Sequence, residues 1–138
     1  MNILVIDANI LISALIKEGL TREILTNLRI NFICPENALK SIYSYKKVII
    51  RKAKIDEKTF NIILLRLLKY VNLIPLDIIN AFREEADRII GRIDKEDTIF
   101  IATALAFNCP VWSDDKHFKQ QQIVKVLTTK DMMELLNN

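Results

Sequence analysis

The sequence has little of what makes a chain flexible or rich in turns: its 138 residues include only 2 glycines and 3 prolines. Disordered linkers and all-β folds with many tight turns need more of both residues. Hydrophobic residues make up 51% of the chain, which is enough for a sizeable core. The length leaves no room for a second domain, so we expect a single domain over residues 1–138.

Long apolar runs are absent, because charged residues interrupt each hydrophobic stretch before it could cross a bilayer. The first residues, NILVID, have neither the basic start nor the apolar length of a secretion signal. We therefore expect a cytoplasmic protein without membrane contact. Cys34 and Cys109 have no metal-binding spacing, and we interpret both as reduced, buried thiols; a disulfide between them is the less favoured alternative.

A strong net charge and a nucleotide-binding loop are missing as well. The formal net charge is +3, from 20 basic and 17 acidic residues, which is too small to indicate a nucleic-acid partner. No GxGxxG or Walker pattern occurs, so we expect no phosphate-binding loop of the nucleotide-binding kind.

Short aliphatic runs alternate with segments of helical spacing along the chain. The runs predict strands at 3–6, 32–34, 73–76, 111–113 and 123–126. Helices are expected up to Gly19, from Thr21 to about Arg29, at 35–52, 57–70, 77–90 and 96–107, and after Thr128. This order predicts an α/β fold, a three-layer α/β/α sandwich around a mostly parallel sheet of four to five strands.

Acidic residues follow two of the expected strands and open the most apolar helix. Asp7 ends the first strand, Asp114 and Asp115 follow the fourth, and Asp97 lies in the first turn of the helix 96–107. Ligands of an open parallel sheet bind beyond the carboxyl ends of its strands. We therefore expect these carboxylates to converge.

Each acid also has a simpler interpretation as a cap. Asp7 or Asn9 could cap the helix that follows, Asp97 could close a capping box with Asp94, and Asp115 could cap a short turn. Taken singly, capping and function are equally good interpretations. Taken together, clustered carboxylates in a partly buried cleft are unfavourable unless they are protonated or neutralised, and a divalent cation would neutralise them.

The type of ligand indicates which cation fits. Carboxylate oxygens without a cluster of His or Cys suit Mg²⁺ or Mn²⁺ and disfavour Zn²⁺. His117 is the single histidine, and we interpret it as a surface or packing residue. A hard cation of this kind suits phosphoryl chemistry, since it activates water and stabilises charge on a phosphodiester.

Two motifs, VIDANILISAL at 5–15 and DKEDTIFIATALAFNCPVWSDDKHF at 94–118, resemble the PIN-domain family of metal-dependent ribonucleases, including its VapC-type toxins. The resemblance covers the whole chain in element order. It implies RNA as substrate, a cleft of acids that binds Mg²⁺ or Mn²⁺, and an antitoxin protein as partner. It also suggests that apolar residues of the first two helices form a groove for a partner or a homodimer contact.

Carried over residue by residue, the resemblance makes Asp7, Asp97 and Asp115 the catalytic and metal-binding acids. The positions expected to support them are Asn9, Ser41, Asp94, Ser113 and Asp114.

One position departs from the family, which usually has a glutamate early in the helix after the second strand. Here the stretch CPENALKSIYSYK places Ser41 there, with Glu36 upstream as an alternative acid. Three acids would hold one metal ion less tightly, so activity would be weakened, dependent on Mn²⁺, or absent. The alternative function is therefore an inactive PIN-like scaffold that binds RNA or a protein partner.

Basic side chains recur at helical spacing in the region 40–54. A solvated helix surface is the simpler interpretation, and contact with RNA phosphates is the functional one. Tyr43 and Tyr45 could stack on bases, although we expect Tyr45 in the core. The candidate RNA-binding residues are Lys40, Lys47, Arg51 and Lys54.

Overall fold

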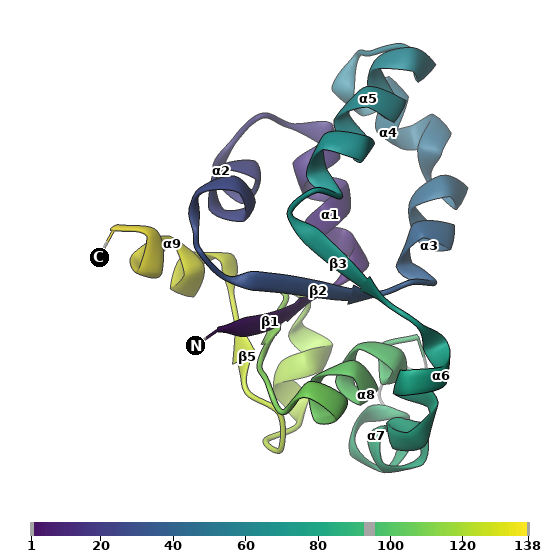
Figure 1. The fold of residues 1–138 in the computed structure, drawn as a ribbon, viewed down its shortest axis with the longest axis vertical. Coiled ribbons are helices and arrows are strands. Elements are labelled where there is room, and N and C mark those ends of the chain that lie inside the picture. The colour runs from purple at the N-terminus through teal and green to yellow at the C-terminus, as the bar shows by residue number, and fades with distance from the viewer. Residues whose placement is uncertain (1, 93–95, 138) are drawn as a thin grey trace.

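The computed structural model describes residues 2–92 and 96–137, and at its centre lies a parallel sheet (Figure 1). Its described strands are β1 Ile3–Ile6, β2 Asn31–Pro35, β3 Val71–Ile74, β4 Val111–Trp112 and β5 Val126–Leu127. They lie in the order β3-β2-β1-β4-β5, and each neighbouring pair is parallel. The predicted α/β class and parallel sheet are confirmed.

Helices cover the sheet on both sides. The first half of the chain forms α1 Ala8–Ile16, α2 Leu20–Asn27, α3 Ala38–Ser44, α4 Lys46–Ala53 and α5 Glu57–Leu67. The second half forms α6 Leu76–Ile79, η1 Asn80–Phe82, α7 Arg83–Ile90, α8 Thr98–Phe107, η2 Lys116–Gln120 and α9 Thr129–Asn137. In Figure 1, α1 to α5 lie above the strands and α6 to α8 below them, which confirms the three-layer sandwich. In the part of the chain that is described, every helix is too short or too polar to span a membrane.

The centre of the sheet explains the aliphatic run at the start of the sequence. β1 pairs with β2 on one side and with β4 on the other, and Leu4, Val5 and Ile6 are completely buried. A strand covered on both faces has no polar side, so its residues need not alternate. The chain leaves β1 toward β2 and returns across the other face to β4. The strand order therefore reverses beside the carboxyl end of β1, where ligands of such sheets bind.

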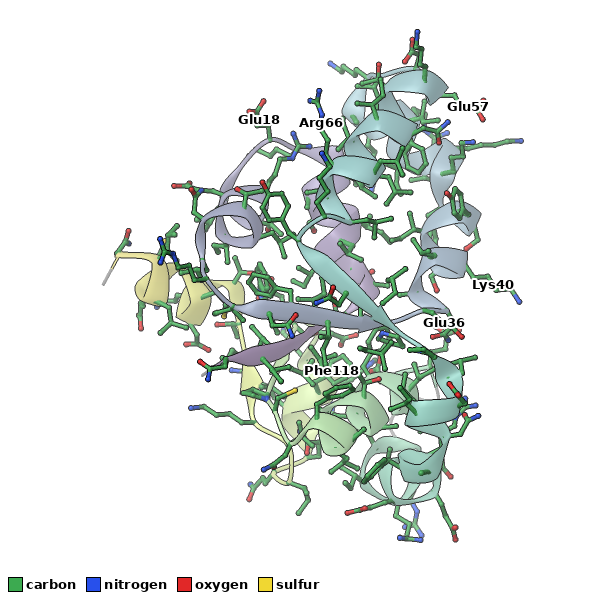
Figure 2. All side chains as sticks on the ribbon, in the orientation of Figure 1. Glu18, Glu36, Lys40, Glu57, Arg66 and Phe118 are labelled. Atoms are coloured by element: carbon green, nitrogen blue, oxygen red, sulfur yellow. The ribbon has the colours of Figure 1, made fainter. Side chains whose placement is uncertain are left out.

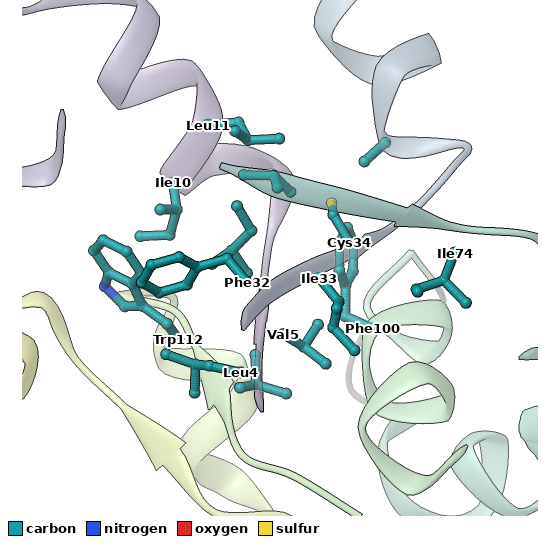
Figure 3. Close-up of a cluster of buried hydrophobic side chains, with 14 of the residues drawn as sticks. Leu4, Val5, Ile10, Leu11, Phe32, Ile33, Cys34, Ile74, Phe100 and Trp112 are labelled. Carbon is teal, nitrogen blue, oxygen red and sulfur yellow. The ribbon is translucent and has the colours of Figure 1, made fainter. Parts of the chain in front are cut away.

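Aromatic packing ties β4 to the rest of the core (Figure 3). The ring of Trp112 is completely buried, with its centroid 5.8 Å from that of Phe32 in β2. Its indole N–H donates a hydrogen bond to the hydroxyl of Thr129 at 3.0 Å, so the buried polar atom is satisfied. Both cysteines are free thiols, as predicted; Cys34 is buried as expected, but Cys109 is only half-buried. Burial raises the pKa of Cys109 to about 11.

The helix expected at 96–107 is the most buried helix of the molecule, as its sequence indicated. Each residue of α8 from Thr98 to Ala104 is buried. Side chains also cap the starts of α5 and α9. Asp56 accepts from the Thr59 N–H at 2.8 Å, and Thr128 and Asp131 cap the start of α9 reciprocally.

The single helix expected at 35–52 is wrong, because the chain breaks at Tyr45 into α3 and α4. The backbone of Tyr45 leaves the helical region, with φ −98° and ψ 7°. The break turns its side chain outward, whereas Ile42 and Ile49 on either side stay buried. Tyr45 is 54% exposed, so its expected place in the core is also wrong.

Other elements begin or end at residues that differ from the predicted ones, and in two strands a loop residue is the reason. β3 ends before Pro75, whose backbone cannot donate to a neighbouring strand. β5 begins at Val126 rather than at Ile123, because the Gln121 side chain accepts from the N–H groups of Ile123 and Val124 and closes a loop there. The helix predicted from Thr21 begins at Leu20, and the helix predicted at 77–90 is divided into α6, η1 and α7.

Phe118 anchors the segment that follows β4. Its side chain is 1% exposed and lies beneath the sheet in Figure 2. Its ring packs edge to face on Phe100 of α8, with centroids 6.4 Å apart and planes at 82°. This contact fixes η2 against α8, and both elements contribute to the site described below.

Replacing this anchor should cost much of the stability of the fold. We expect Phe118→Ala to lower the free energy of unfolding by about 3–5 kcal/mol, because a buried aromatic ring leaves a cavity. Ile123→Ala is the comparison: that side chain is 70% exposed, and the change should stay within about 0.5 kcal/mol. Urea denaturation measures both. Equal losses in the two variants would contradict the placement of η2.

Candidate functional site

A cleft of about 450 Å³ opens beyond the carboxyl end of β1, between α1, α3 and α8. Its polar lining residues are Asp7, Asn9, Asn37, Ser41, Ser44, Tyr45, Arg83, Glu96 and Asp97. These residues come from segments far apart in the sequence, which the parallel sheet brings to one edge. The cleft thus lies where the strand order predicts a ligand site.

A larger hollow, of about 660 Å³, lies at the opposite ends of the strands and includes Asn2, Cys109 and Asp131. The carboxylate of Asp131 already caps α9, and its hydrogen bonds with Thr128 lower its pKa. We therefore assign the candidate chemistry to the smaller, acidic cleft.

Asp7 is buried at the end of β1, with 4% of its surface exposed. Its Oδ1 accepts from the Ile10 N–H at 2.9 Å and caps α1, while its Oδ2 accepts from the Ser113 hydroxyl. Burial raises the pKa of Asp7 to about 6, against the lowering effect of these two hydrogen bonds. The nearby negative charges of Asp115 and Asp114 raise it further. The capping interpretation is thus correct for Asp7, and it does not exclude a role in the cleft.

Asp97 is also buried, with 8% exposed, and it stands at the start of α8. Its backbone oxygen accepts from Phe100 at 3.1 Å, but its side chain caps no N–H of that helix within the described residues. Its Oδ2 lies 3.8 Å from Nδ1 of His117. The side chain is therefore directed toward η2. Asp94, the other member of the expected capping box, lies outside the described residues.

The neighbouring acids Asp114 and Asp115 have different partners. Asp114 accepts from the N–H and the hydroxyl of Thr129, at 2.7 and 2.5 Å, and so caps α9. Asp115 accepts from the N–H of His117 at 2.9 Å, and its own N–H donates to the hydroxyl of Ser113 at 3.0 Å. The two carboxylates thus point to different elements, and this separation limits their repulsion.

Ser113 connects the acids of the two strands. Its side chain is 1% exposed, and its hydroxyl donates to Asp7 while it accepts from the backbone of Asp115. Asn9 lines the same cleft but is exposed, and Asp7 rather than Asn9 caps α1.

His117 is on the surface, as expected, but the sequence did not predict that it lies beside two of the acids. Its side chain is 46% exposed, as a surface residue would be, yet its Nδ1 lies 3.4 Å from Oδ1 of Asp115. Asp97, Asp115 and His117 each offer one ligand atom, and these atoms all lie within 4.8 Å of one another. They could share one metal ion. The signal in the sequence was the i to i+2 spacing from Asp115 across a tight turn.

The helix side of the cleft has no glutamate at the expected place. Ser41 lines the cleft, as predicted, but Glu36 is exposed and accepts from the Leu76 N–H at 3.2 Å. The Glu36 carboxylate is thus directed to the start of α6, so it does not supply the missing acid. Glu96, which precedes Asp97, does line the cleft and brings a carboxylate there that the sequence did not predict.

Positive charge also reaches the cleft from places that the sequence did not reveal. Arg83 lines it from the start of α7, and its guanidinium donates to Asn80 at 3.4 Å. The place of Arg83 at this cleft was not predicted from the sequence. Asn37 lines the cleft as well, and its Oδ1 is buried without a hydrogen-bond partner among the described residues. Such an atom is unfavourable unless something not present here satisfies it.

Exposed basic residues continue from the cleft along α3 and α4. Figure 2 shows Lys40 beside α3, projecting outward. Tyr43 is 52% exposed, and its ring meets Phe60 of α5. Lys46 is paired with Glu57, but the four candidate RNA-binding residues are all exposed: Lys40, Lys47, Arg51 and Lys54.

Comparison with known proteins identifies the family. The fold resembles the crystal structure of VapBC2 from Rickettsia felis bound to a DNA fragment from their promoter, with a TM-score of 0.67. The sequences are 15% identical, and the match covers 91% of this chain and 98% of that chain, so the likeness concerns the fold. No curated protein matches the chain. The family model for the PIN domain matches residues 5–137, so the chain belongs to the PIN-domain family.

Proposed function

We propose that the chain is a metal-dependent endoribonuclease that hydrolyses RNA phosphodiester bonds in the acidic cleft. The observation that carries this proposal is the convergence of Asp7, Asp97 and Asp115 beyond the ends of β1 and β4. Asp7 and Asp97 line one cleft, and Asp115 is linked to Asp7 through Ser113 and to Asp97 through His117. We assign the catalytic and metal-binding roles to these three acids.

The lining of the cleft fits a divalent cation such as Mg²⁺ or Mn²⁺. A buried carboxylate with a raised pKa, a second buried carboxylate and an amide oxygen without a partner all gain from a positive charge nearby. When bound, the ion would supply charge stabilisation at a phosphodiester and make a water more acidic. Asp97 and Asp115 would hold it, together with the carboxylate of Asp7, which lines the cleft.

The remaining polar residues would orient the acids rather than react. Ser113 fixes Asp7 and the backbone of Asp115, and Asp114 holds the turn after β4 to α9. Asn9 would contact the ligand at the rim, since it is exposed and lines the cleft. We retain Asp94 as a supporting residue of the segment that enters α8.

The surface of α3 and α4 would bind the RNA backbone. Lys40, Lys47, Arg51 and Lys54 are exposed on these helices or at their end, and contacts of this kind bind phosphates without regard to sequence. Tyr45 lines the cleft with an exposed ring, so it offers a base a stacking surface at the site of cleavage.

The VapC-type motifs and the likeness to VapBC2 support a role as the toxin of a toxin–antitoxin pair. An antitoxin protein would then be the partner. A homodimer is part of the same proposal, and exposed apolar side chains of α2 and α5 provide surface for such contacts: Leu20, Ile62 and Leu65.

An inactive scaffold is the second candidate, and Ser41 favours it. With a hydroxyl where relatives carry a carboxylate, the cleft has less negative charge for a metal ion. A scaffold would still bind RNA or a protein through the same surfaces. Absence of Mn²⁺ binding at millimolar concentration, together with absence of RNA cleavage, would leave this candidate alone.

The neighbouring acids provide the sharpest test of the ribonuclease. We expect Asp115→Asn to abolish Mn²⁺-dependent cleavage of RNA, with little loss of fold, because it removes a carboxylate that faces Asp97 and His117. Asp114→Asn is the matched control and should retain most of the activity, since its oxygen can still accept from Thr129. Gel analysis of total RNA, with and without Mn²⁺, measures both. Cleavage by Asp115→Asn at the parent's rate would refute the assignment.

The raised pKa of Asp7 predicts a pH-dependent gain in stability on substitution. Between pH 4 and 6 the folded state holds a proton that the unfolded state has released, so the carboxylate destabilises the fold increasingly as the pH rises toward 6. The shift from 3.8 to about 6 corresponds to about 3 kcal/mol. At pH 7.5 and without metal, Asp7→Asn should therefore raise the free energy of unfolding by up to about 3 kcal/mol, and the gain should vanish near pH 4.

Urea denaturation in EDTA at several pH values measures this difference. Asp56→Asn is the control, because Asp56 is exposed and its hydrogen bonds with Thr59 lower its pKa, so its substitution should bring no gain at pH 7.5. If Asp7→Asn lowered the free energy of unfolding at pH 7.5, the charged carboxylate of Asp7 would be shown to stabilise the fold, which contradicts the prediction.

Restoring the family's acid tests the alignment of α3. We expect Ser41→Glu to increase Mn²⁺ affinity by roughly tenfold or more, because it adds a carboxylate to the lining of the cleft. Ser44→Glu, one turn later on the same cleft, is the comparison and should have a smaller effect. Calorimetric titration gives both affinities, and an unchanged value for Ser41→Glu would contradict the assigned position.

A further inference from the structure

The imidazole of His117 occupies a place that surface exposure alone does not explain. Its Nδ1 lies 3.4 Å from Oδ1 of Asp115 and 3.8 Å from Oδ2 of Asp97. The backbone holds this arrangement, because the His117 N–H donates to Asp115 and the next residue, Phe118, is buried against α8. The ring is therefore carried on a fixed turn and not on a free loop.

These separations are close to those expected of donors around one ion. Charge-assisted hydrogen bonds between nitrogen and a carboxylate are shorter, at about 2.7–2.9 Å. Two ligand atoms that each lie about 2.1 Å from one metal ion are about 3.0–3.5 Å from each other. This range applies when the ligand–metal–ligand angle is between roughly a right angle and a tetrahedral angle. The His117–Asp115 distance lies within that range and the His117–Asp97 distance just beyond it. Small side-chain rotations would close the difference.

The other side of the cleft has few donors to offer. Ser41 has no carboxylate, and both oxygens of Asp7 already accept hydrogen bonds, from Ile10 and Ser113. The compact set of donor atoms is consequently the one formed by Asp97, Asp115 and His117.

We propose that His117 is a metal ligand through Nδ1, so that the cleft holds a transition-metal ion such as Mn²⁺ in preference to Mg²⁺. The proposal rests on the metal-binding part of the proposed function. An imidazole nitrogen suits transition metals, whereas Mg²⁺ prefers oxygen donors in near-ideal octahedral geometry. His117 thereby supplies, from η2, a donor that Ser41 lacks.

Calorimetric titration of the full chain with MnCl₂ and with MgCl₂ tests the preference. The parent should bind Mn²⁺ at least about tenfold more tightly than Mg²⁺. His117→Ala should lose at least about tenfold of the Mn²⁺ affinity, since even outer partners of a metal ligand contribute that much, while Mg²⁺ affinity changes by less than about twofold. Lys116→Ala removes a neighbouring charge without a donor and should behave as the parent. An equal loss for both ions in His117→Ala would overturn the proposal.

Pulsed electron paramagnetic resonance of the Mn²⁺-loaded protein gives an independent readout. The chain has one histidine, so in untagged protein any coupling from an imidazole nitrogen belongs to His117. We expect this coupling in the parent and in Lys116→Ala, and its loss in His117→Ala. A parent spectrum without imidazole coupling would refute ligation by His117.

The two proposals fail separately. Imidazole coupling in a protein that cuts no RNA would support His117 as a ligand and refute the ribonuclease. RNA cleavage with Mn²⁺ but without imidazole coupling would support the ribonuclease and refute His117 as a ligand.

Discussion

The hydroxyl of Ser113 is the contact on which the acidic edge depends. It donates to the buried oxygen of Asp7 and accepts from the backbone of Asp115, so it couples the end of β1 to the turn after β4. The pairing of Ile6 with Trp112 sets this geometry, and the Asp7 N–H donates to the Trp112 oxygen one step further. Without the hydroxyl, an oxygen of Asp7 would be a buried acceptor with no donor, which is unfavourable. The register between β1 and β4 thus determines how far the carboxylates of Asp7 and Asp115 lie from each other.

Capping and function prove to be compatible in these acids. Asp7 caps α1 with one oxygen and lines the cleft, while Asp115 caps η2 and faces His117. Hydrogen bonds from backbone N–H groups orient each carboxylate before any ligand arrives, as a preorganised site requires. Asp114 makes the contrast clear, because both its oxygens are used at the start of α9. An acid's neighbours, rather than its capping role, therefore decide whether it belongs to the cleft.

The sequence predicted those features that follow from burial and topology. A continuous aliphatic run before Asp7 and an apolar α8 need no knowledge of loops, and the carboxyl ends of parallel strands must share an edge. It did not predict features that depend on where a loop turns. Ile123 is as hydrophobic as a strand residue, yet the hydrogen bonds of Gln121 hold it in a loop, 70% exposed. For the same kind of reason a tight turn brings His117 beside Asp97 and Asp115, and the start of α7 brings Arg83 to the cleft.

The two sides of the cleft differ in charge. Carboxylates line the cleft on the side of β1 and α8. On the other side Ser41 of α3 contributes a hydroxyl and Tyr45, between α3 and α4, a phenol, and Lys40 is exposed next to Ser41. An anionic backbone would be repelled by the first side and attracted to the second, so a bound cation is what would allow it to approach the acids. A glutamate at position 41 would place negative charge on both sides. The serine would instead leave the basic side open to a phosphate, and a metal ion would depend more on the donors of η2 and α8. A ligand role for His117 is consistent with that substitution.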